Sequence, residues 1–595
     1  MKRIVKVFLP LLLCCIFAFG FLAGCKPPQE DVGLDDEGNI IIRPGSKVPT
    51  VVFWGYGDQV ELDVFTKLTD QFNKLHKDQI KVNYIQKAST GYGEAMRVTL
   101  GGNSGPDVLY VGDADFKAVA DYGYLEPLDN YIAKSEEIVL EEMWETSLDR
   151  YKYDVKTATF DGPGAKIWAV PKDIGPTVIY YNETFFNDAN ISVISVGAQD
   201  LTAFNAGQSD SRGKTKAQYG IDFEVKEKGY FVNGSKRFFN NQIPMSWDET
   251  VACANRIQEV KVSPKVYGFY TEWWFNYGWT VGGDCVEYIP APADPAYNGG
   301  YYDFTLMDST KNYIVADNAL SGFTINGNKY EPGEIISYQD KLVSLTAASK
   351  TISPQILGAV ETVLNELPSQ REAFVEFIRI GQLSNKQVEP GVYGYGITPS
   401  PTSIGGDAAK TRAFSQGSVA MLVDGRWNVP NFRNEMDGKY EWDVAPLPIY
   451  KEYDANGNIK VHGRKAGHSG SVALVINSRS SLKNASWLFL EYIGGRTGQT
   501  EQAKSGFAIP SQKDIADSEV FLQPDKNPKN AGIFIDAARH QTPGDWWYLR
   551  DKQWIDPWAG KLNGSVRNGN MTLTEFENCV EFKNTFEMLK GYTKK

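Results

Sequence analysis

The sequence predicts an α/β protein of at least two domains, built on mixed, mainly parallel sheets with helices on both faces. Two observations carry this prediction. Short apolar runs rich in β-branched and aromatic residues alternate with amphipathic runs of helical period, which is typical of βαβ units. After residue 48 the chain continues for more than 540 residues, several times the about 100–150 residues of a usual domain.

The start of the chain predicts export and lipidation. Basic residues lead into an apolar run over 7–22, which is shorter than the about 20 residues that cross a bilayer. The run ends in Leu22-Ala23-Gly24-Cys25, which resembles the bacterial lipobox and implies a signal peptide over 1–24 and a lipid on Cys25. An ordinary cleaved signal or an uncleaved anchor is the alternative. A lipid on Cys25 would hold the protein on the extracytoplasmic face of the membrane without spanning it.

Residues 25–48 are predicted to form a flexible tether. This segment contains Pro27-Pro28 and several acidic residues but few large apolar ones, a composition that does not support a packed core.

Charge excludes a nucleic-acid partner. The chain has a net charge of −12 and no concentrated run of Lys and Arg, whereas binding to phosphates needs a basic surface.

Three cysteines follow Cys25, and they are Cys253, Cys285 and Cys579. In an exported protein Cys253 and Cys285 could pair, which would leave Cys579 over. Three buried, unpaired thiols are the alternative.

The chain after the tether opens with five alternating elements. Because ligands bind beyond the carboxyl ends of strands in such sheets, Trp54 to Asp58 and Gly112-Asp113 are predicted to lie on one rim. The elements are a strand over Val51–Trp54, a helix over Glu61–His76, a strand over Ile80–Gln86, a helix over Gly93–Leu100 and a strand over Asp107–Val111.

Two stretches interrupt this pattern, near 190–240 and near 285–350. They are rich in Gly, Asn, Tyr and Asp and contain the turn signals Asn233-Gly234 and Asn326-Gly327, so we expect loop and hairpin insertions. Over Gln355–Ile380 the apolar spacing returns to the helical period.

The order of several short motifs resembles the extracellular solute-binding family 1, the carbohydrate-binding components of ABC importers. The resemblance covers most of the chain after the tether, apart from the insertions. The motifs are Gly105-Pro106-Asp107-Val108, Tyr122 to Leu128, Ile167 to Pro171, Ile179 to Asn182, Ser246 to Glu249, Tyr267 to Phe269, Ala413 to Met421, Gly425 to Trp427, Pro446 to Pro448, Ser469 to Ser471, Ser505 to Pro510 and the Trp-rich stretch 546–558.

The resemblance implies a two-lobed, periplasmic-binding-protein-like fold of type II, with a hinge between the lobes. It implies an N-terminal lobe over 49–165 plus 450–510 and a C-terminal lobe over 166–449 plus 511–595. It also places chain crossings at 166–175 and near Pro446-Leu447-Pro448, where proline restricts the backbone.

A sugar site needs flat aromatic faces beside short polar groups, and several loops offer both. Trp54 and Asp58 follow the first strand, although Trp54 could instead be a core residue. Asp113 follows the strand that ends at Val111, and it could accept sugar hydroxyls or cap the next helix.

The densest aromatic cluster contains Trp273, Trp274, Trp279 and Asp284. The family places ligand contacts in this region. Adjacent residues of a strand point to opposite faces, so one of Trp273 and Trp274 is expected to face the core.

Trp427 follows an apolar strand over Val419–Val423, and the resemblance implies that it stacks on the ligand; a packing role is the alternative. Ser469 belongs to a Ser-Gly-Ser run where backbone amides could approach a ligand, or which could be a tight turn. Trp546 and Trp547 have no helical spacing that would place them in a core stripe, so an aromatic platform is predicted there.

Catalytic motifs were not found. The four His residues lack metal-ligand spacing, and neither a nucleophile elbow nor a phosphate loop occurs. The sequence does not exclude a pair of catalytic carboxylates, because a glycosidase site is defined by the distance in space between its two carboxyl groups.

The leading hypothesis is therefore a monomeric binding protein without cofactor or metal, which closes over an oligosaccharide and delivers it to an ABC permease. An exported polysaccharide-active enzyme and a peptide- or lipid-binding surface protein are the alternatives.

Overall fold

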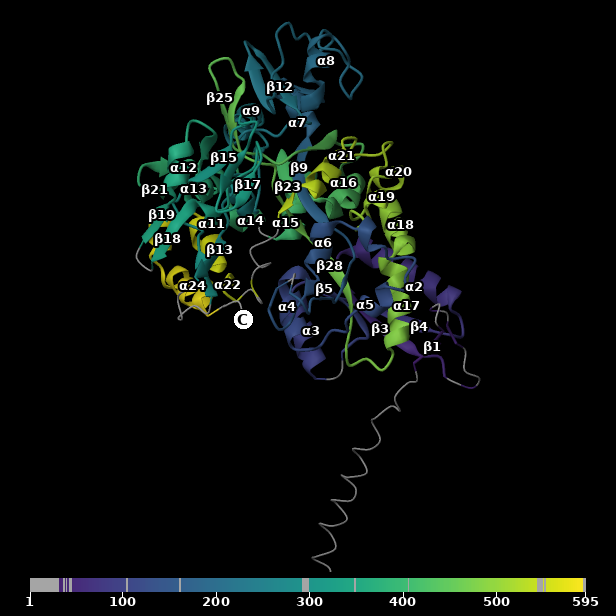
Figure 1. The fold of residues 1–595 in the computed structure, drawn as a ribbon. Coiled ribbons are helices and arrows are strands. Elements are labelled where there is room, and N and C mark those ends of the chain that lie inside the picture. The colour runs from purple at the N-terminus through teal and green to yellow at the C-terminus, as the bar shows by residue number, and fades with distance from the viewer. Residues whose placement is uncertain are drawn as a thin grey trace, which may run out of the picture.

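The computed structural model has two α/β lobes, and the chain crosses between them several times (Figure 1). The structure describes residues 31–591 except 36–37, 39, 42–44, 46, 103–104, 160–161, 292–298, 347–348, 405, 543–548 and 550–552. Cys25, Trp546 and Trp547 lie outside the described residues, as does the side chain of Ser469.

The first lobe is built on a five-stranded sheet of order β4-β3-β5-β28-β8. The three strands from the start of the chain run parallel, with Val51 opposite Val82 and Phe53 opposite Val108. β28 returns from far along the chain and pairs antiparallel with β5. The strands are β3 (Thr50–Tyr56), β4 (Lys81–Lys87), β5 (Val108–Gly112), β8 (Val170–Pro171) and β28 (Val472–Ile476).

Helices cover both faces of this sheet. On one face Phe53 packs between Phe65 of α2 and Phe489 of α17, and on the other Tyr56 contacts Tyr92 of α3. All five elements predicted over 51–111 are present, with small shifts of their ends. The helices are α2 (Gln59–Leu75), α3 (Tyr92–Gly101), α4 (Asp113–Asp121) and α17 (Lys483–Gly494).

The second lobe is organised around one long buried strand, β9. It pairs antiparallel with β23, β24 and β27, and β29 extends the sheet beside β27. The sheets are therefore mixed, as predicted. In the sheet of the first lobe two strand pairs are parallel and two are antiparallel. The neighbours of β9 are all antiparallel to it, because they come from distant segments rather than from βαβ units. The strands are β9 (Gly175–Asn182), β23 (Met421–Gly425), β24 (Trp442–Ala445), β27 (Gly467–Gly470) and β29 (Gln541–Thr542).

The helical stretch predicted over Gln355–Ile380 is interrupted. The strand β20 (Leu364–Leu367) separates α12 (Pro354–Ala359) from α13 (Gln370–Ile380), since Pro368 cannot continue a helix and Ser369 starts a new one with a capping box. The other long helices of this lobe are α9 (Trp247–Val260), α15 (Asp407–Ser415), α16 (Val429–Met436), α21 (Gly532–Arg539) and α24 (Val580–Lys590).

Both predicted insertions are small β-structures on the second lobe. Near 190–240, β10 (Ile191–Ile194), β12 (Lys236–Asn240) and β11 (Tyr230–Asn233) form a sheet at the top of Figure 1, with its own core around Phe204 and Phe238. Near 285–350 the chain forms antiparallel pairs that include β13 (Val286–Ala291), β14 (Gly299–Phe304), β15 (Asn312–Val315), β16 (Phe323–Ile325), β17 (Asn328–Tyr330), β18 (Leu342–Thr346) and β19 (Ser349–Ile352).

Two of the crossings between the lobes lie close together. Lys172 to Ile174 connect β8 to β9, within the predicted crossing over 166–175, and Ser471 connects β27 to β28. The predicted crossing near Pro446 lies wholly in the second lobe, because the hairpin that follows it packs there: Lys451 Nζ donates to the carbonyl of Pro244 at 2.9 Å. We therefore propose that the first lobe resumes at residue 471 rather than at 450.

Part of the predicted tether is attached to the first lobe. Residues Gly33–Leu34 (β1) pair antiparallel with Ile40–Ile41 (β2), and Val32 and Ile40 pack against the core of this lobe. The apolar side chains in an otherwise polar segment account for this contact, which the prediction of a freely flexible tether over 25–48 did not include.

Cys253, Cys285 and Cys579 carry free thiols, the first two buried and the third partly exposed. Among the helices of the described residues, none is both long and apolar enough to cross a membrane.

Candidate functional site

Trp427 lies where the second lobe meets the crossing between β8 and β9. Its half-buried indole rests against two glycines: a Cβ added to Gly175 would lie 2.8 Å from the ring, and one added to Gly425 only 1.9 Å. Both strands therefore need glycine at these positions for the ring to lie flat on their backbones. The part of the indole that the glycines do not cover stays accessible.

Trp273 and Trp274 have different surroundings. Trp274 is 9% exposed and packs edge-on against Trp558, with ring centroids 5.2 Å apart. Trp273 is half-buried and stacks on His468, with centroids 5.1 Å apart and planes 20° apart. The two residues precede the helix α10 (Phe275–Thr280) rather than lying in a strand, and Trp274 is the one that faces the core.

The first lobe brings a charged pair to the same region. Arg150, 3% exposed, places a guanidinium nitrogen 3.4 Å from a carboxylate oxygen of Asp113 at the start of α4. The other terminal nitrogen lies 3.5 Å from the carbonyl of Thr542 in β29 of the second lobe. Burial, and then the positive charge of Arg150, lower the pKa of His468 to about 3, so the ring that stacks on Trp273 is neutral at pH 7.

Three carboxyl groups gather around Tyr56 at the end of β3. Burial raises the pKa of Tyr56, and the charges of Glu61, Asp173 and Asp113 raise it further. The phenol therefore stays protonated and keeps its O–H donor at the rim.

A buried ion cluster occupies the crossing itself. Lys172 is 2% exposed and its Nζ lies 2.9 Å from Glu61 of α2, while it also pairs with Asp173. Burial alone would lower the pKa of Lys172, but the charges of Asp173 and Glu61 outweigh it and raise the pKa. Burial raises the pKa of Glu61 against the opposing charge of Lys172. The cluster ties α2 of the first lobe to the connecting segment.

Asp58 has two roles where the two lobes meet. Its Oδ1 accepts from the backbone N–H of Glu61 at 3.1 Å and so caps α2, and its Oδ2 accepts from Asn431 Nδ2 of the second lobe at 3.0 Å. Asn431 also donates to Asn428, whose amide donates to Asp424 at 2.8 Å. A hydrogen-bonded chain thus runs from the strand that precedes Trp427 to the first lobe.

Three predicted site residues have local roles instead. Trp279 is 1% exposed and packs at a tilt against Phe275 in the core, so its ring is not accessible to a ligand in this structure. Asp284 accepts from the N–H of Cys285 at 2.7 Å, as a turn residue does. Trp54 packs against the core of the first lobe, with Lys87 Nζ 3.9 Å from its ring centroid.

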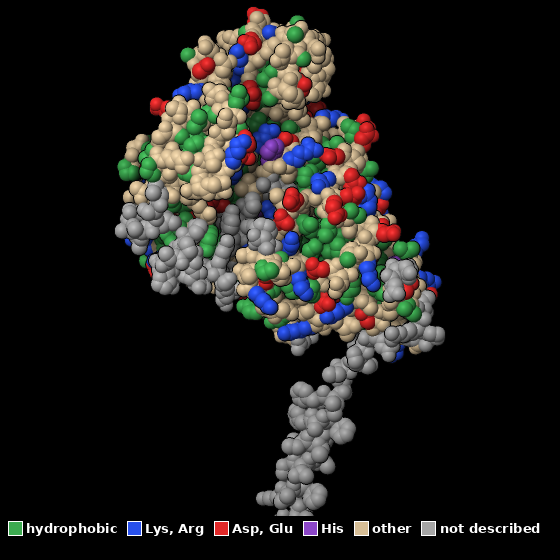
Figure 2. Space-filling view, viewed as in Figure 1, with side chains coloured by type: hydrophobic (Ala, Val, Ile, Leu, Met, Phe, Trp, Pro, Cys, Tyr) green, Lys and Arg blue, Asp and Glu red, His purple; other side chains and the backbone are tan. Residues whose placement is uncertain are grey.

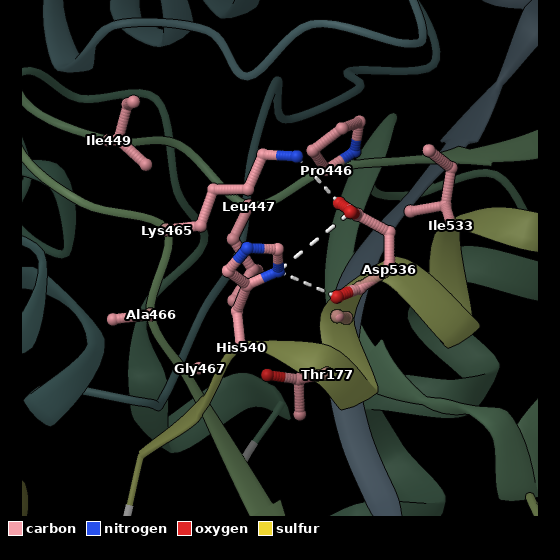
Figure 3. Close-up of a pocket in the computed structure, with 11 residues that line it drawn as sticks. Thr177, Pro446, Leu447, Ile449, Lys465, Ala466, Gly467, Ile533, Asp536 and His540 are labelled. Atoms are coloured by element: carbon pink, nitrogen blue, oxygen red, sulfur yellow. Dashed lines mark hydrogen bonds and ion pairs between the residues drawn. The ribbon is translucent and has the colours of Figure 1, made fainter. Parts of the chain in front are cut away.

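A separate small pocket of about 30 Å³ lies within the second lobe (Figure 3). Its mouth carries Lys465, whose Nζ lies 2.8 Å from Asp536, and His540, whose Nδ1 lies 2.8 Å from the Asp536 carbonyl. Its walls are mostly apolar and include Leu447. A space of this size holds about one water molecule and is too small for a sugar.

Among the described residues, no group of three or more His, Cys, Asp or Glu side chains is placed to hold a metal ion.

Comparison with protein families decides the class of this chain. A family model described as bacterial extracellular solute-binding protein matches residues 56–287, and a second model with the same description matches residues 384–531. The chain belongs to the bacterial extracellular solute-binding proteins. A comparison with curated protein sequences gave no match.

Solved structures share the fold of this solute-binding protein. The GacH receptor of Streptomyces glaucescens, solved unliganded and with acarbose, has a TM-score of 0.56 at 17% identity, with 92% of this chain and 100% of that chain covered. An ABC substrate-binding protein from Listeria monocytogenes in complex with cycloalternan has a TM-score of 0.55 at 15% identity, covering 92% and 99%. Maltose-bound MalE3 of T. maritima has a TM-score of 0.53 at 16% identity, covering 91% and 100%.

Sequence reasoning on this solute-binding protein missed Arg150, Lys172, His468 and Asn431. Each is a single polar residue outside any motif, and its role depends on partners that lie far away in the sequence. A weak signal existed for His468, which immediately precedes the Ser-Gly-Ser run already singled out.

Proposed function

We propose that this solute-binding protein captures an extracellular sugar, specifically an oligosaccharide, between its lobes and delivers it to an ABC importer. The protein binds without catalysis and needs no cofactor. Ligand binding shifts the equilibrium between the open and closed forms toward the closed form, which the permease recognises.

The position of Trp427 carries this proposal. Its indole is held flat on Gly175 and Gly425 beside the crossing, so its orientation is fixed before a ligand arrives. The apolar C–H face of a sugar ring stacks on such a surface. Trp273, stacked on neutral His468, offers a second aromatic surface that belongs to the same lobe.

Polar groups of the first lobe supply partners for hydroxyls. Asp113 can accept and Tyr56 can donate, and the buried guanidinium of Arg150 holds Asp113 in place. Similar structures hold cycloalternan, acarbose and maltose, which supports a sugar as the ligand class.

The lipid anchor on Cys25 is part of the proposal. The lipobox-like Leu22-Ala23-Gly24-Cys25 supports processing before Cys25 and attachment to the extracytoplasmic face of the cell membrane. Changing Cys25 to Ser should release most of the protein from the membrane fraction, and a variant that stays membrane-bound like wild type would rule out this anchor.

Calorimetric titration with a panel of oligosaccharides tests the sugar site. Trp427→Ala should weaken binding by roughly 1–3 kcal/mol, about ten- to more than a hundredfold in Kd. Trp442→Ala is the matched control, because Trp442 is 2% exposed in the core of the same lobe and should affect melting instead. Unchanged affinity with a lowered Tm for Trp427→Ala would assign that residue to packing, and hydrolysis of a bound glycan would favour the enzyme alternative.

A further inference from the structure

The first residues of the described chain dock onto the N-terminus of α17. Asp31 accepts from the backbone N–H of Asn484 at 2.8 Å and of Ala485 at 3.1 Å. The carbonyl of Val32 accepts from the Asn484 side chain at 2.9 Å. Since Leu482, at the N-cap position of α17, provides no side-chain cap, Asp31 satisfies donors that the helix leaves open.

This docking shortens the tether. Five residues separate Cys25 from Asp31 in the sequence. Even a fully extended chain spans at most about 3.6 Å per residue, so Cys25 lies within roughly 20 Å of the N-terminus of α17. A lipid on Cys25 would therefore hold one particular face of the first lobe close to the membrane.

That face has the composition of a membrane interface. We call it the anchor face and define it by Val98, Tyr122, Tyr124, Arg479 and Lys483. Val98 and Tyr122 are 71% and 65% exposed. Tyr122 stacks on Tyr124 with centroids 5.7 Å apart, and the guanidinium of Arg479 lies 4.7 Å from the Tyr124 ring.

Cations flank these aromatics. Arg479 is exposed, and Lys483 keeps 36% of its side chain exposed although it pairs with Glu126 at 2.6 Å. Figure 2 shows Lys and Arg side chains along the lower edge of the first lobe. Tyrosines at the headgroup level and cations near anionic lipids are both favourable at a bilayer surface.

We propose that the anchor face lies against the lipid headgroups and that Asp31 fixes this orientation, so that the second lobe is the one that moves during closure. This inference rests on the lipid anchor of the proposed function. It does not depend on which sugar binds.

Spin-label relaxation on vesicles tests this orientation. The full, lipidated chain with Cys579→Ser receives a nitroxide at Val98→Cys or, as control, at Val232→Cys. Val232 is 53% exposed in the insertion of the second lobe, and Cys253 and Cys285 are buried. The vesicles contain phosphatidylglycerol, phosphatidylethanolamine and a nickel-chelating lipid.

We expect nickel to relax the label at Val98 several-fold more strongly than the label at Val232. Asp31→Ala should reduce this contrast, whereas Asp70→Ala, which removes an exposed carboxylate from α2, should preserve it. Equal relaxation at the two positions would overturn the proposal, and full contrast in Asp31→Ala would overturn the role of Asp31.

Flotation of the same vesicles separates this test from the anchor itself. If the protein does not float with the vesicles, the proposed lipid anchor on Cys25 is wrong. If it floats but the two labels relax equally, the anchor stands and only the proposed orientation is wrong. If Tyr122→Ser abolishes transport while the label at Val98 remains unrelaxed, the anchor face binds a protein and the lipid contact is excluded.

Discussion

Asn431 of the second lobe donates a hydrogen bond to Asp58 of the first lobe, with Nδ2 and Oδ2 3.0 Å apart. Asp58 is also the residue that caps α2, whose first turn carries Glu61 of the buried ion cluster. The contact therefore links the movable second lobe to the element that positions the crossing.

Removing this contact should weaken ligand binding, because closure would then lack one hydrogen bond between the lobes. Asn431→Ala is expected to cost about 0.5–1.5 kcal/mol, or roughly two- to tenfold in Kd by calorimetry. Asn434→Ala, at an exposed position of the same helix, should leave Kd unchanged. Asp58→Ser keeps a capping side chain on α2, so its effect and that of Asn431→Ala should not add; additive effects would show that the two residues act separately.

Truncation of Trp273 and truncation of Trp274 should affect different properties, the first sugar affinity and the second stability. Trp273→Ala is expected to weaken sugar binding by roughly 1–3 kcal/mol, since it removes an accessible ring stacked on His468. Trp274→Ala should instead destabilise the fold by about 3–5 kcal/mol, because it leaves a cavity beside Trp558. Calorimetry and thermal unfolding of both variants separate the outcomes, and a lowered affinity for Trp274→Ala at unchanged Tm would reverse the assignment.

The buried cluster at the crossing should make Lys172 important for stability. Lys172→Met leaves Glu61 and Asp173 without their cation and is expected to cost about 3–5 kcal/mol in the free energy of unfolding. Lys67→Met removes a lysine that pairs with Glu501 but is 61% exposed, so it should cost less than about 1 kcal/mol. Denaturant titrations compare the two, and similar small losses would argue against a structural role for the cluster.

Acid should destabilise the protein partly through His468. Its pKa is about 3 in the folded protein and about 6.5 in an unfolded chain, so between these values the unfolded state binds more protons. The contribution of His468 to stability is therefore complete above pH 6.5 and is lost as pH falls toward 3, by at most about 1.4 kcal/mol per pH unit.

His468→Asn should flatten this dependence between pH 7 and pH 4.5, since an amide oxygen can still accept from the N–H of Gly470. An unchanged slope in His468→Asn would mean that His468 does not stay neutral in the folded state.

The fold of the first lobe was largely predictable because each segment over 51–111 carries its own periodicity. The strand Val472–Ile476 belongs to the same sheet, but its place beside β5 depends on pairing with residues more than 350 positions away in the sequence. The sequence did not show that part of the predicted tether is attached to the first lobe. Asp31 caps a helix that begins at Lys483, and no residue near Asp31 in the sequence indicates that partner.

The candidate site was predictable where aromatic residues follow strands, as at Trp427. Trp279 has the same local composition as Trp273, and only packing shows that it is buried. Arg150 and Lys172 could not be found, because their importance arises from burial beside carboxylates that lie far away in the sequence.

Solution scattering with and without saturating oligosaccharide tests the central claim, capture by closure of two lobes, most directly. Using a sugar whose binding calorimetry has established, we expect the radius of gyration to fall on saturation, to an extent limited by the preference of the ligand for the closed form. An unchanged radius of gyration under demonstrated binding would contradict lobe closure as the signal to the importer.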